Sequence, residues 1–336
     1  MNINNVESKV ITTGQPVART SVKEEVPDSF QKTSAPAKLD ADLMRELQKT
    51  LSGTKVSDDG TKLERLERPM TEDEKVRFHE YFPVLDVDKA VVTDEATPAY
   101  NCIAWSGGIT DQWIWPPSMY PNLTEDKAFD KFYASRGFKR AETGELARWS
   151  NDQGITHGSI SGLGHGPRWE SKCGGEARIQ HGFDELQGEI YGKPDVFYTK
   201  VSEPKEMPNK LKKLSANIKL GIKAKTLQVN PEIKKKFDGL YASWQTFRKD
   251  PKITMSANPA DYCKTEAFTE ITKMGGSVIP LLMEKISNGD FFCLQAVGEI
   301  AKTSRGPERA LALSGKEVNT SEQNKAYNAL MKYYNS

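Results

Sequence analysis

The sequence predicts an α+β protein that ends in an all-α part. In the first half of the ordered chain, hydrophobic residues recur at helical spacing behind good capping residues. The pattern then alternates, so that Ile155, His157 and Ser159 share one face of a predicted strand. Helical spacing returns after residue 205. We therefore expect an α+β domain over 68–203 and a helical module over 205–336.

The first sixty residues differ in composition from the rest. They are rich in Ser, Thr, Lys, Glu and Pro and contain no Trp, Tyr, His or Cys. Such a segment buries too little surface to offset its chain entropy, so we expect residues 1–60 to be disordered. One short helix within 40–51 could dock on the body of the protein or on a partner such as a chaperone, through a face formed by Leu43, Met44, Leu47 and Leu51.

Composition narrows the function classes. The formal net charge of the 336 residues is +1, so no bulk field favours nucleic acid or an anionic membrane. No apolar run has the length of a transmembrane helix, and the N-terminus lacks the features of a Sec signal. The four cysteines form no CxxC pair, which argues against a zinc site or a disulfide scaffold. We expect reduced thiols, no cofactor and no metal.

The helices of the α+β domain are predicted from their caps. Thr71 is followed by three acidic residues and leads into a helix that Pro83 ends. Asn101 can cap a helix that starts at Cys102. Thr124 caps a further helix that closes at Gly137.

The strands follow these helices. A glycine-rich turn over 161–167 joins the strand containing His157 to a hairpin partner over 168–172, and 196–198 reads as a further strand. Between the Cys102 helix and the Thr124 helix lies an aromatic–proline loop, residues 110–117, which contains Trp113, Ile114, Trp115, Pro116 and Pro117.

Cys102 is the best candidate nucleophile. A thiol at a helix start has its thiolate stabilised by the helix dipole and by unpaired N–H groups. His157 is the best candidate base, because a strand fixes its direction and Gly158 leaves room beside it. The alternative for Cys102 is a free cysteine buried as a small hydrophobe. A metal site is a further alternative, but no pair among His157, His165, His181 and Cys173 has i,i+4 spacing.

These motifs resemble those of known protein families. The run Tyr100-Asn101-Cys102-Ile103-Ala104-Trp105, with Trp113-Ile114-Trp115-Pro116-Pro117 and Thr156-His157, resembles an uncharacterised bacterial domain family with an Asn-Cys-Ile-Ala-Trp motif. More distantly, the order of Cys helix, His strand and polar strand resembles papain-like cysteine proteases and deamidases. The resemblance implies a papain-like fold, a Cys102 nucleophile and a His157 base.

Papain-like sites orient the base with Asn or Asp, whereas this chain offers Glu170 or Ser171. We place these two residues beside Cys102 and His157 as catalytic candidates. The candidate substrate-binding residues are the aromatic side chains and the glycine-turn histidine near these motifs: Trp105, Trp113, Trp115, His165 and Trp169.

The C-terminal part reads as helical. A dense lysine run over 209–236 lacks interleaved aromatic residues, so a solvated face or linker is favoured over a nucleic-acid patch. Apolar periodicity then predicts helices from Ile233, from Ser256, over 279–283 and over 291–300. These segments resemble small HEAT-like helical modules, and Cys263 and Cys293 are expected in their core.

Two functions compete. The first is a cysteine hydrolase that acts on proteins, as a Gln/Asn deamidase or a protease, in a bacterial effector secreted without a Sec signal. Its substrate would be a host or rival-cell protein in a reducing target-cell cytosol; otherwise the protein is cytoplasmic. The second is a non-catalytic protein-binding or scaffold protein that uses the aromatic–proline loop and the helical module.

Overall fold

The computed structural model describes residues 66–162, 168–204 and 209–336. The predicted tail, its 40–51 helix, most of the glycine-rich turn and His165 lie outside these residues. Among the described helices, none combines the length and apolar character needed to cross a bilayer.

The predicted α+β class is confirmed. An eight-stranded antiparallel sheet forms from strands with the bounds β1 Arg68–Pro69, β2 Val91–Asp94, β3 Phe138–Ala141, β4 Leu146–Asn151, β5 Gly154–Ser161, β6 Trp169–Lys172, β7 Arg178–His181 and β8 Lys193–Lys200. The strand order is β1-β2-β7-β6-β5-β4-β8-β3. The predicted hairpin is present, since β5 and β6 pair antiparallel at Ile160↔Glu170 and Ser161↔Trp169.

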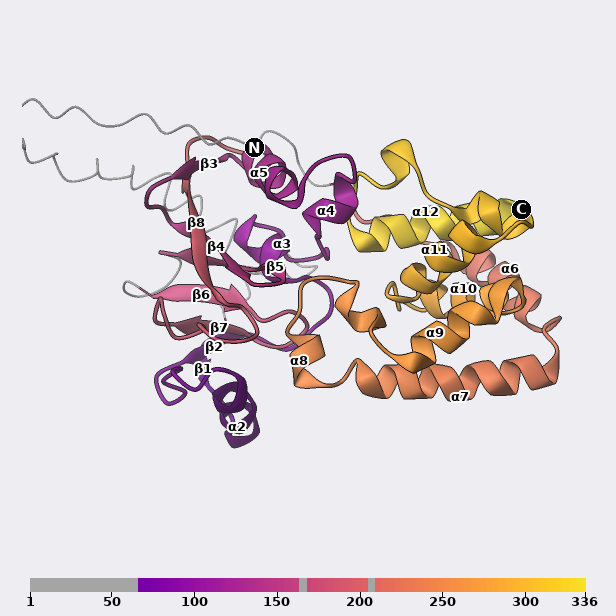
Figure 1. Cartoon of the computed structure of the whole chain (residues 1–336), viewed down its shortest axis with the longest axis horizontal. Helices are drawn as coiled ribbons and strands as arrows, with labels where there is room; N and C mark the ends of the chain where they lie inside the picture. The colour runs from indigo at the N-terminus through magenta and orange to yellow at the C-terminus, as the bar shows by residue number, and fades with distance from the viewer. Residues whose placement is uncertain (1–65, 163–167, 205–208) are drawn as a thin grey trace, which may run out of the picture. The chain divides into compact units, whose positions relative to one another are not determined.

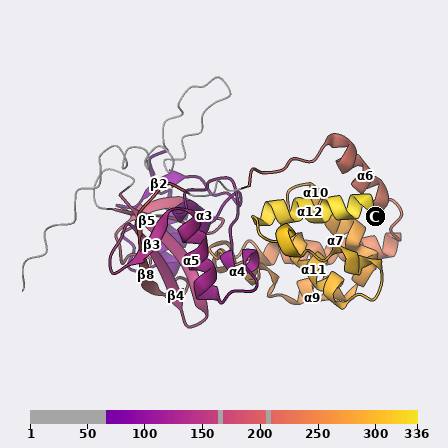
Figure 2. The same ribbon diagram turned by 90° about the horizontal axis from the view of Figure 1, so that it is seen from above.

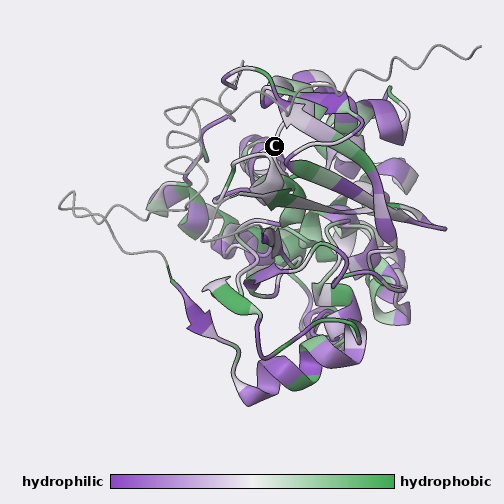
Figure 3. Ribbon diagram, turned by 90° about the vertical axis from the view of Figure 1, so that its left-hand side faces the viewer, coloured by the Kyte–Doolittle hydropathy of each residue, from purple (hydrophilic) through white to green (hydrophobic). Residues whose placement is uncertain are grey.

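Short helices cover the two faces of this sheet (Figure 1). Their bounds are α2 Glu72–Tyr81, α3 Cys102–Ser106, α4 Pro116–Met119 and α5 Glu125–Ser135. Helices α3 and α5 pack on one face with Ile160 and Leu146. Helix α2 packs on the other face through Phe78 and Phe82, and its remaining length is mostly hydrophilic (Figure 3). We call these the α3 face and the α2 face.

Predicted caps are confirmed at several helix starts. Thr71 and Glu74 form a capping box at α2, in which each side chain bonds the other residue's backbone N–H. The Asn101 side chain accepts from the Ala104 N–H at 3.0 Å at α3. Helix α5 begins after Thr124, although the Thr124 side chain makes no capping bond.

The C-terminal helices gather around a second core (Figure 2). Their bounds are α6 Ala216–Thr226, α7 Pro231–Phe247, α8 Pro251–Thr254, α9 Glu266–Lys273, α10 Ile279–Ser287, α11 Cys293–Thr303 and α12 Glu322–Asn335. Cys293 is buried there as predicted, whereas Cys263 is only partly buried.

The helix predicted from Ser256 is present as α9, but its predicted start is wrong. Residues 256–258 have no regular structure, and α9 begins only at Glu266. The Ser256 hydroxyl accepts from the Asn258 N–H at 3.1 Å, so a local side-chain bond competes with helix formation. Pro259 follows directly and favours extended backbone at Asn258. This irregular stretch lies beside the candidate site.

Candidate functional site

Cys102 is the first residue of α3 and is completely buried. Helix α3 is only five residues long, so its dipole is smaller than the sequence led us to expect. The backbone N–H groups of Gly158 and Ile103 donate toward the sulfur and favour the thiolate, but burial has the larger effect and raises the pKa of Cys102 to about 12. The thiol is therefore neutral near pH 7, contrary to the activated thiolate that we predicted.

The charge of Lys172 acts on the Cys102 thiol, a role that the sequence analysis did not identify. Its buried ammonium donates to the carbonyls of Thr97 at 3.0 Å, Gly174 at 2.6 Å and Glu176 at 2.5 Å. Burial lowers the pKa of Lys172 to about 8, so its charge persists near neutral pH. This charge favours the Cys102 thiolate, but too weakly to offset burial.

His157 belongs to a chain of hydrogen bonds that crosses three strands. Its Nε2 lies 2.8 Å from the Ser171 hydroxyl, which lies 2.8 Å from Nε2 of His181. Nδ1 of His181 lies 2.6 Å from the carbonyl of Gly182. Burial holds both histidine pKa values down, that of His181 at about 4, so both rings are neutral near pH 7.

This chain fixes the tautomers. The carbonyl of Gly182 can only accept, so the His181 proton is on Nδ1 and its Nε2 accepts the Ser171 O–H. The Ser171 oxygen must then accept from Nε2–H of His157. The lone pair of His157 is consequently on Nδ1, which is buried and has no hydrogen-bond partner. Ser171 and His181 thus present His157 as a base with one free nitrogen.

The predicted close pair of Cys102 and His157 is not formed. Gly158, and not His157, faces α3: a Cβ built on Gly158 would lie 2.7 Å from the Ser106 hydroxyl and 3.4 Å from Cδ1 of Ile103. Adjacent strand residues point to opposite faces, so His157 lies on the α2 face. There its ring stacks on Tyr191, with centroids 3.9 Å apart and an interplanar angle of 15°.

A β-bulge explains this difference. The register pairs Ser150 with Ile155 and Trp149 with His157, which leaves Thr156 as an extra residue on β5. Ile155 consequently packs on the α3 face with Cys102, while His157 emerges on the α2 face. The alternation predicted from the sequence assumed an unbroken strand, and the one-residue insertion reverses the direction of His157.

Glu170 does not lie behind the imidazole. Its carboxylate pairs with Arg178 at 2.9 Å and accepts from the Thr93 hydroxyl at 2.8 Å. The Arg178 guanidinium lies 3.9 Å from the ring centroid of Trp105. Because this side of β6 is the α3 face, the third-residue position belongs to Ser171 alone.

The predicted aromatic surface is mostly buried. Trp105 and Trp113 are completely buried and Trp115 nearly so, while Trp169 is half-buried against Phe183. Trp113 packs in the C-terminal core, edge-on to the ring of Tyr262. The aromatic–proline loop is therefore an internal contact in this structure, and the prediction of an exposed recognition surface there is wrong.

The indole of Trp113 nevertheless donates a hydrogen bond close to the helix that carries Cys102. Its Nε1 donates to the carbonyl of Ala257 at 2.8 Å, and Nδ2 of Asn101 donates to the same oxygen at 3.2 Å. Ala257 is completely buried in the cluster that contains Cys102. Two N–H donors thus converge on one peptide carbonyl next to the thiol-bearing helix, an arrangement that also suits a carbonyl oxygen gaining negative charge.

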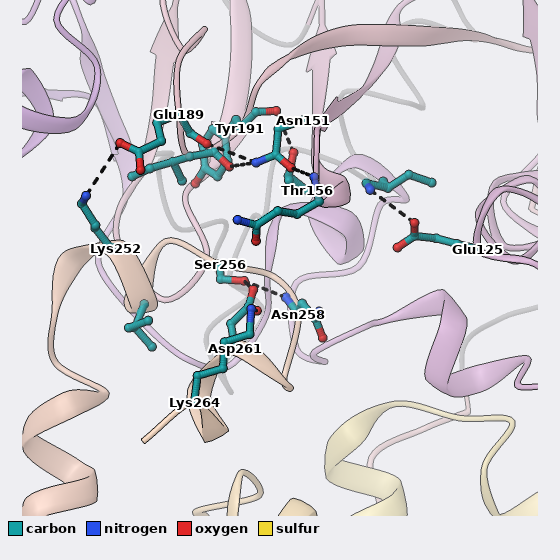
Figure 4. Close-up of a pocket in the computed structure, with 14 residues that line it drawn as sticks. Glu125, Asn151, Thr156, Glu189, Tyr191, Lys252, Ser256, Asn258, Asp261 and Lys264 are labelled. Carbon is teal, nitrogen blue, oxygen red and sulfur yellow. Dashed lines mark hydrogen bonds and ion pairs between the residues drawn. The ribbon is translucent and has the colours of Figure 1, made fainter. Parts of the chain in front are cut away.

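Tyr191 also lines a pocket of about 280 Å³ (Figure 4). Thr156 lines it from β5 and Tyr191 from the turn before β8, while Ser256 and Asn258 line it from the irregular stretch and Asp261 from the short 3-10 helix that follows. This pocket lies close to the buried His157 ring, since Tyr191 contributes to both. Among the described residues, no group of three or more His, Cys, Asp or Glu side chains could hold a metal ion.

Fold and site together define an α+β domain with a buried thiol, a tautomer-fixed histidine and a carbonyl-binding pair of N–H donors. A family profile described as a domain of unknown function (DUF7689) matches residues 91–199. This range includes Asn101, Cys102, Trp113 and His157 but not Ala257, whose carbonyl accepts from the two donors. No curated protein and no solved structure matches the chain.

Proposed function

We propose that residues 91–199 carry a thiol hydrolase of papain-like type that acts on protein chains, with Cys102 as nucleophile and His157 as base. The observation that carries the proposal is the Ser171–His181 support of His157, which leaves a basic nitrogen free in a buried position. A buried polar atom without a partner is costly and is typical of a functional site. The proposal requires the described conformation to be a resting state, because Cys102 and His157 lie on opposite faces of the sheet.

The chemistry needs no group beyond these side chains and water. His157 Nδ1 takes the thiol proton, and the sulfur attacks a carbonyl carbon while the C=O electron pair moves onto oxygen. The N–H donors of Asn101 and Trp113 are suited to stabilise that oxygen. The proton then passes to the leaving nitrogen, the C–N bond breaks, and water hydrolyses the thioester and restores the thiol.

One rearrangement is required. The N–H of Gly158 donates toward the Cys102 sulfur, so the backbone of His157 is already adjacent to the thiol. Because His157 lies on the opposite face of the sheet, rotation of its side chain alone cannot bring the ring to the thiol, and the proposal requires the register of β5 to shift at the Thr156 bulge so that His157 turns toward α3. Solvation of the opened site lowers the pKa of Cys102 from its buried value.

The product distinguishes the two hydrolytic reactions. Loss of ammonia from a Gln or Asn side chain adds about one dalton to a peptide, whereas cleavage of the main chain creates new termini. We expect the wild-type protein to produce one of these changes in a denatured bacterial or eukaryotic proteome, read by mass spectrometry. Cys102→Ala and His157→Ala should abolish it, Ser171→Ala should reduce it, and Cys293→Ala should not change it. Equal products from wild type and Cys102→Ala would refute the hydrolase.

A second candidate is a non-catalytic protein-binding domain, and complete burial of Cys102 on the face opposite to His157 favours it. In that case Asn101 and Trp113 bind peptide carbonyls and no bond is broken. The same proteome experiment separates the two, because a binder leaves every peptide mass unchanged.

The setting that we propose is consistent with the thiols. All four cysteines are free, as is usual for proteins of a reducing compartment. We retain the delivered bacterial effector, with a protein of the target cell as substrate, as the setting that this proposal favours.

A further inference from the structure

The last residue of α8 and the irregular stretch that follows it cross the candidate site and are held there by their backbone. The Thr254 carbonyl accepts from the Gly175 N–H at 2.6 Å, and the Met255 carbonyl accepts from the Tyr191 hydroxyl at 3.1 Å. The Ala257 carbonyl accepts from both Trp113 and Asn101. We call residues Thr254–Ala257 the strap.

Two strap side chains enter separate buried clusters. Met255 is completely buried in the cluster that contains Cys173 and Tyr191. Ala257 is completely buried in the cluster that contains Cys102. Main-chain bonds that give affinity, with side-chain pockets that give selectivity, are how domains bind peptide segments.

The sheet domain is shaped for a close backbone approach at this place. A Cβ on Gly174 would lie 2.2 Å from the Thr254 carbonyl oxygen and 2.5 Å from the Met255 carbonyl carbon. Gly174 also has φ +54°, which favours glycine. The strap additionally bonds through its own side chain, since the Thr254 hydroxyl donates to Glu176 at 2.9 Å.

We propose that the strap is a built-in occupant of a peptide-binding groove at Cys102, and that the groove's ligand is a protein segment with a small residue in the place of Ala257 and an unbranched apolar residue in the place of Met255. The assignment of that ligand as substrate rests on the proposed function. The placement of the strap next to the start of α3 does not, because Ala257 belongs to the same buried cluster as Cys102 and its carbonyl accepts from Asn101, the residue before Cys102.

Native-state labelling of the full chain with iodoacetamide, read by mass spectrometry at each cysteine, tests this inference. In Gly174→Ala the new methyl displaces the strap, so the labelling rate of Cys102 should rise about tenfold or more while that of Cys293 stays unchanged. Two variants control for this. Gly175→Ala places its methyl 3.5 Å from Thr254, an ordinary contact, and Gly315→Ala has a similar φ of +56° with open space around it.

Thr254→Val provides a gentler second variant, because it loses only the hydroxyl's bonds to Glu176 and to the Pro251 carbonyl and leaves the groove intact. Its Cys102 labelling should rise about fivefold, again without a change at Cys293. Equal Cys102 rates in wild type and both strap-releasing variants would overturn the inference, as would a parallel rise at Cys293, which signals global opening. Labelling reports access and not turnover, so an inert protein with a mobile strap would refute the hydrolase alone.

Discussion

Gly158→Ala tests the placement on which the site depends, namely that β5 turns Gly158 toward α3 and His157 away from it. The added methyl would lie 2.6 Å from the Tyr133 hydroxyl and 2.7 Å from the Ser106 hydroxyl. Both groups are buried and bonded to each other at 3.0 Å, so neither can move freely. Overpacking of this kind lowers the free energy of unfolding by about 1–3 kcal/mol.

The assay is urea unfolding followed by circular dichroism and tryptophan fluorescence. Gly239→Ala is the matched control, since Gly239 lies on an exposed turn of α7 with no atom near its new Cβ. It should raise the free energy of unfolding by about 0.5–1 kcal/mol. Adding Tyr133→Phe to Gly158→Ala removes the closest contact and should recover at least about 0.5 kcal/mol. A neutral or stabilising Gly158→Ala would refute the bulge and return His157 to the α3 face.

Three further predictions concern the buried polar groups. The pKa of His181 is about 4 when folded and near 6.5 when unfolded, so its stabilising contribution is present above pH 6.5 and is lost as the pH falls toward 4. Urea unfolding should show a loss on the order of 3 kcal/mol over this window, reduced in His181→Asn. Arg178→Met leaves the Glu170 carboxylate buried without its cation and should cost about 3–5 kcal/mol in the same assay. Trp113→Phe keeps an aromatic ring but loses the bond to Ala257; it should cost about 1 kcal/mol and speed Cys102 labelling.

Each of these predictions has a result that would contradict it. A pH-independent unfolding free energy between pH 6.5 and 4 would mean that His157 and His181 are not buried as neutral rings. Lys302→Ala, which breaks an exposed pair with Glu299, should cost no more than about 0.5 kcal/mol; a loss as large as that of Arg178→Met would show that burial is not the cause.

Helix starts could be predicted from the sequence because the cap and the first turn are local. The acidic residues after Thr71 and the side chain of Asn101 act within three residues of their targets. The β5–β6 hairpin was likewise predictable from alternation across a short turn.

Strand β7 could not be predicted in this way. Arg178, Gln180 and His181 are buried there without hydrophobic alternation, and their partners come from distant parts of the chain. Arg178, for example, bonds the Thr93 carbonyl at 2.7 Å, 85 residues away. Long-range bonds of this kind leave no periodic trace in a sequence.

The residues of the candidate site could be predicted from the sequence, but their arrangement in space could not. Cys102 lies on the α3 face and His157 on the α2 face, because a single extra residue at Thr156 determines which face His157 occupies. The strap was missed for another reason. The apolar period around Ser256 suggested a helix, but tertiary contacts to Tyr191 and Trp113 hold that segment irregular together with the local Ser256–Asn258 bond.

The most direct test of a covered thiol nucleophile is alkylation by a peptide electrophile that copies the strap. Thr-Met-Ser-Ala chloromethyl ketone would bind the vacated groove, and the Cys102 sulfur would displace chloride to form a thioether. Intact mass and peptide mapping of the Thr254→Val protein should show one adduct, on Cys102, formed faster than with the reversed peptide and slowed by His157→Ala. Equal rates for the two peptides, or adducts shared among all four cysteines, would contradict the account.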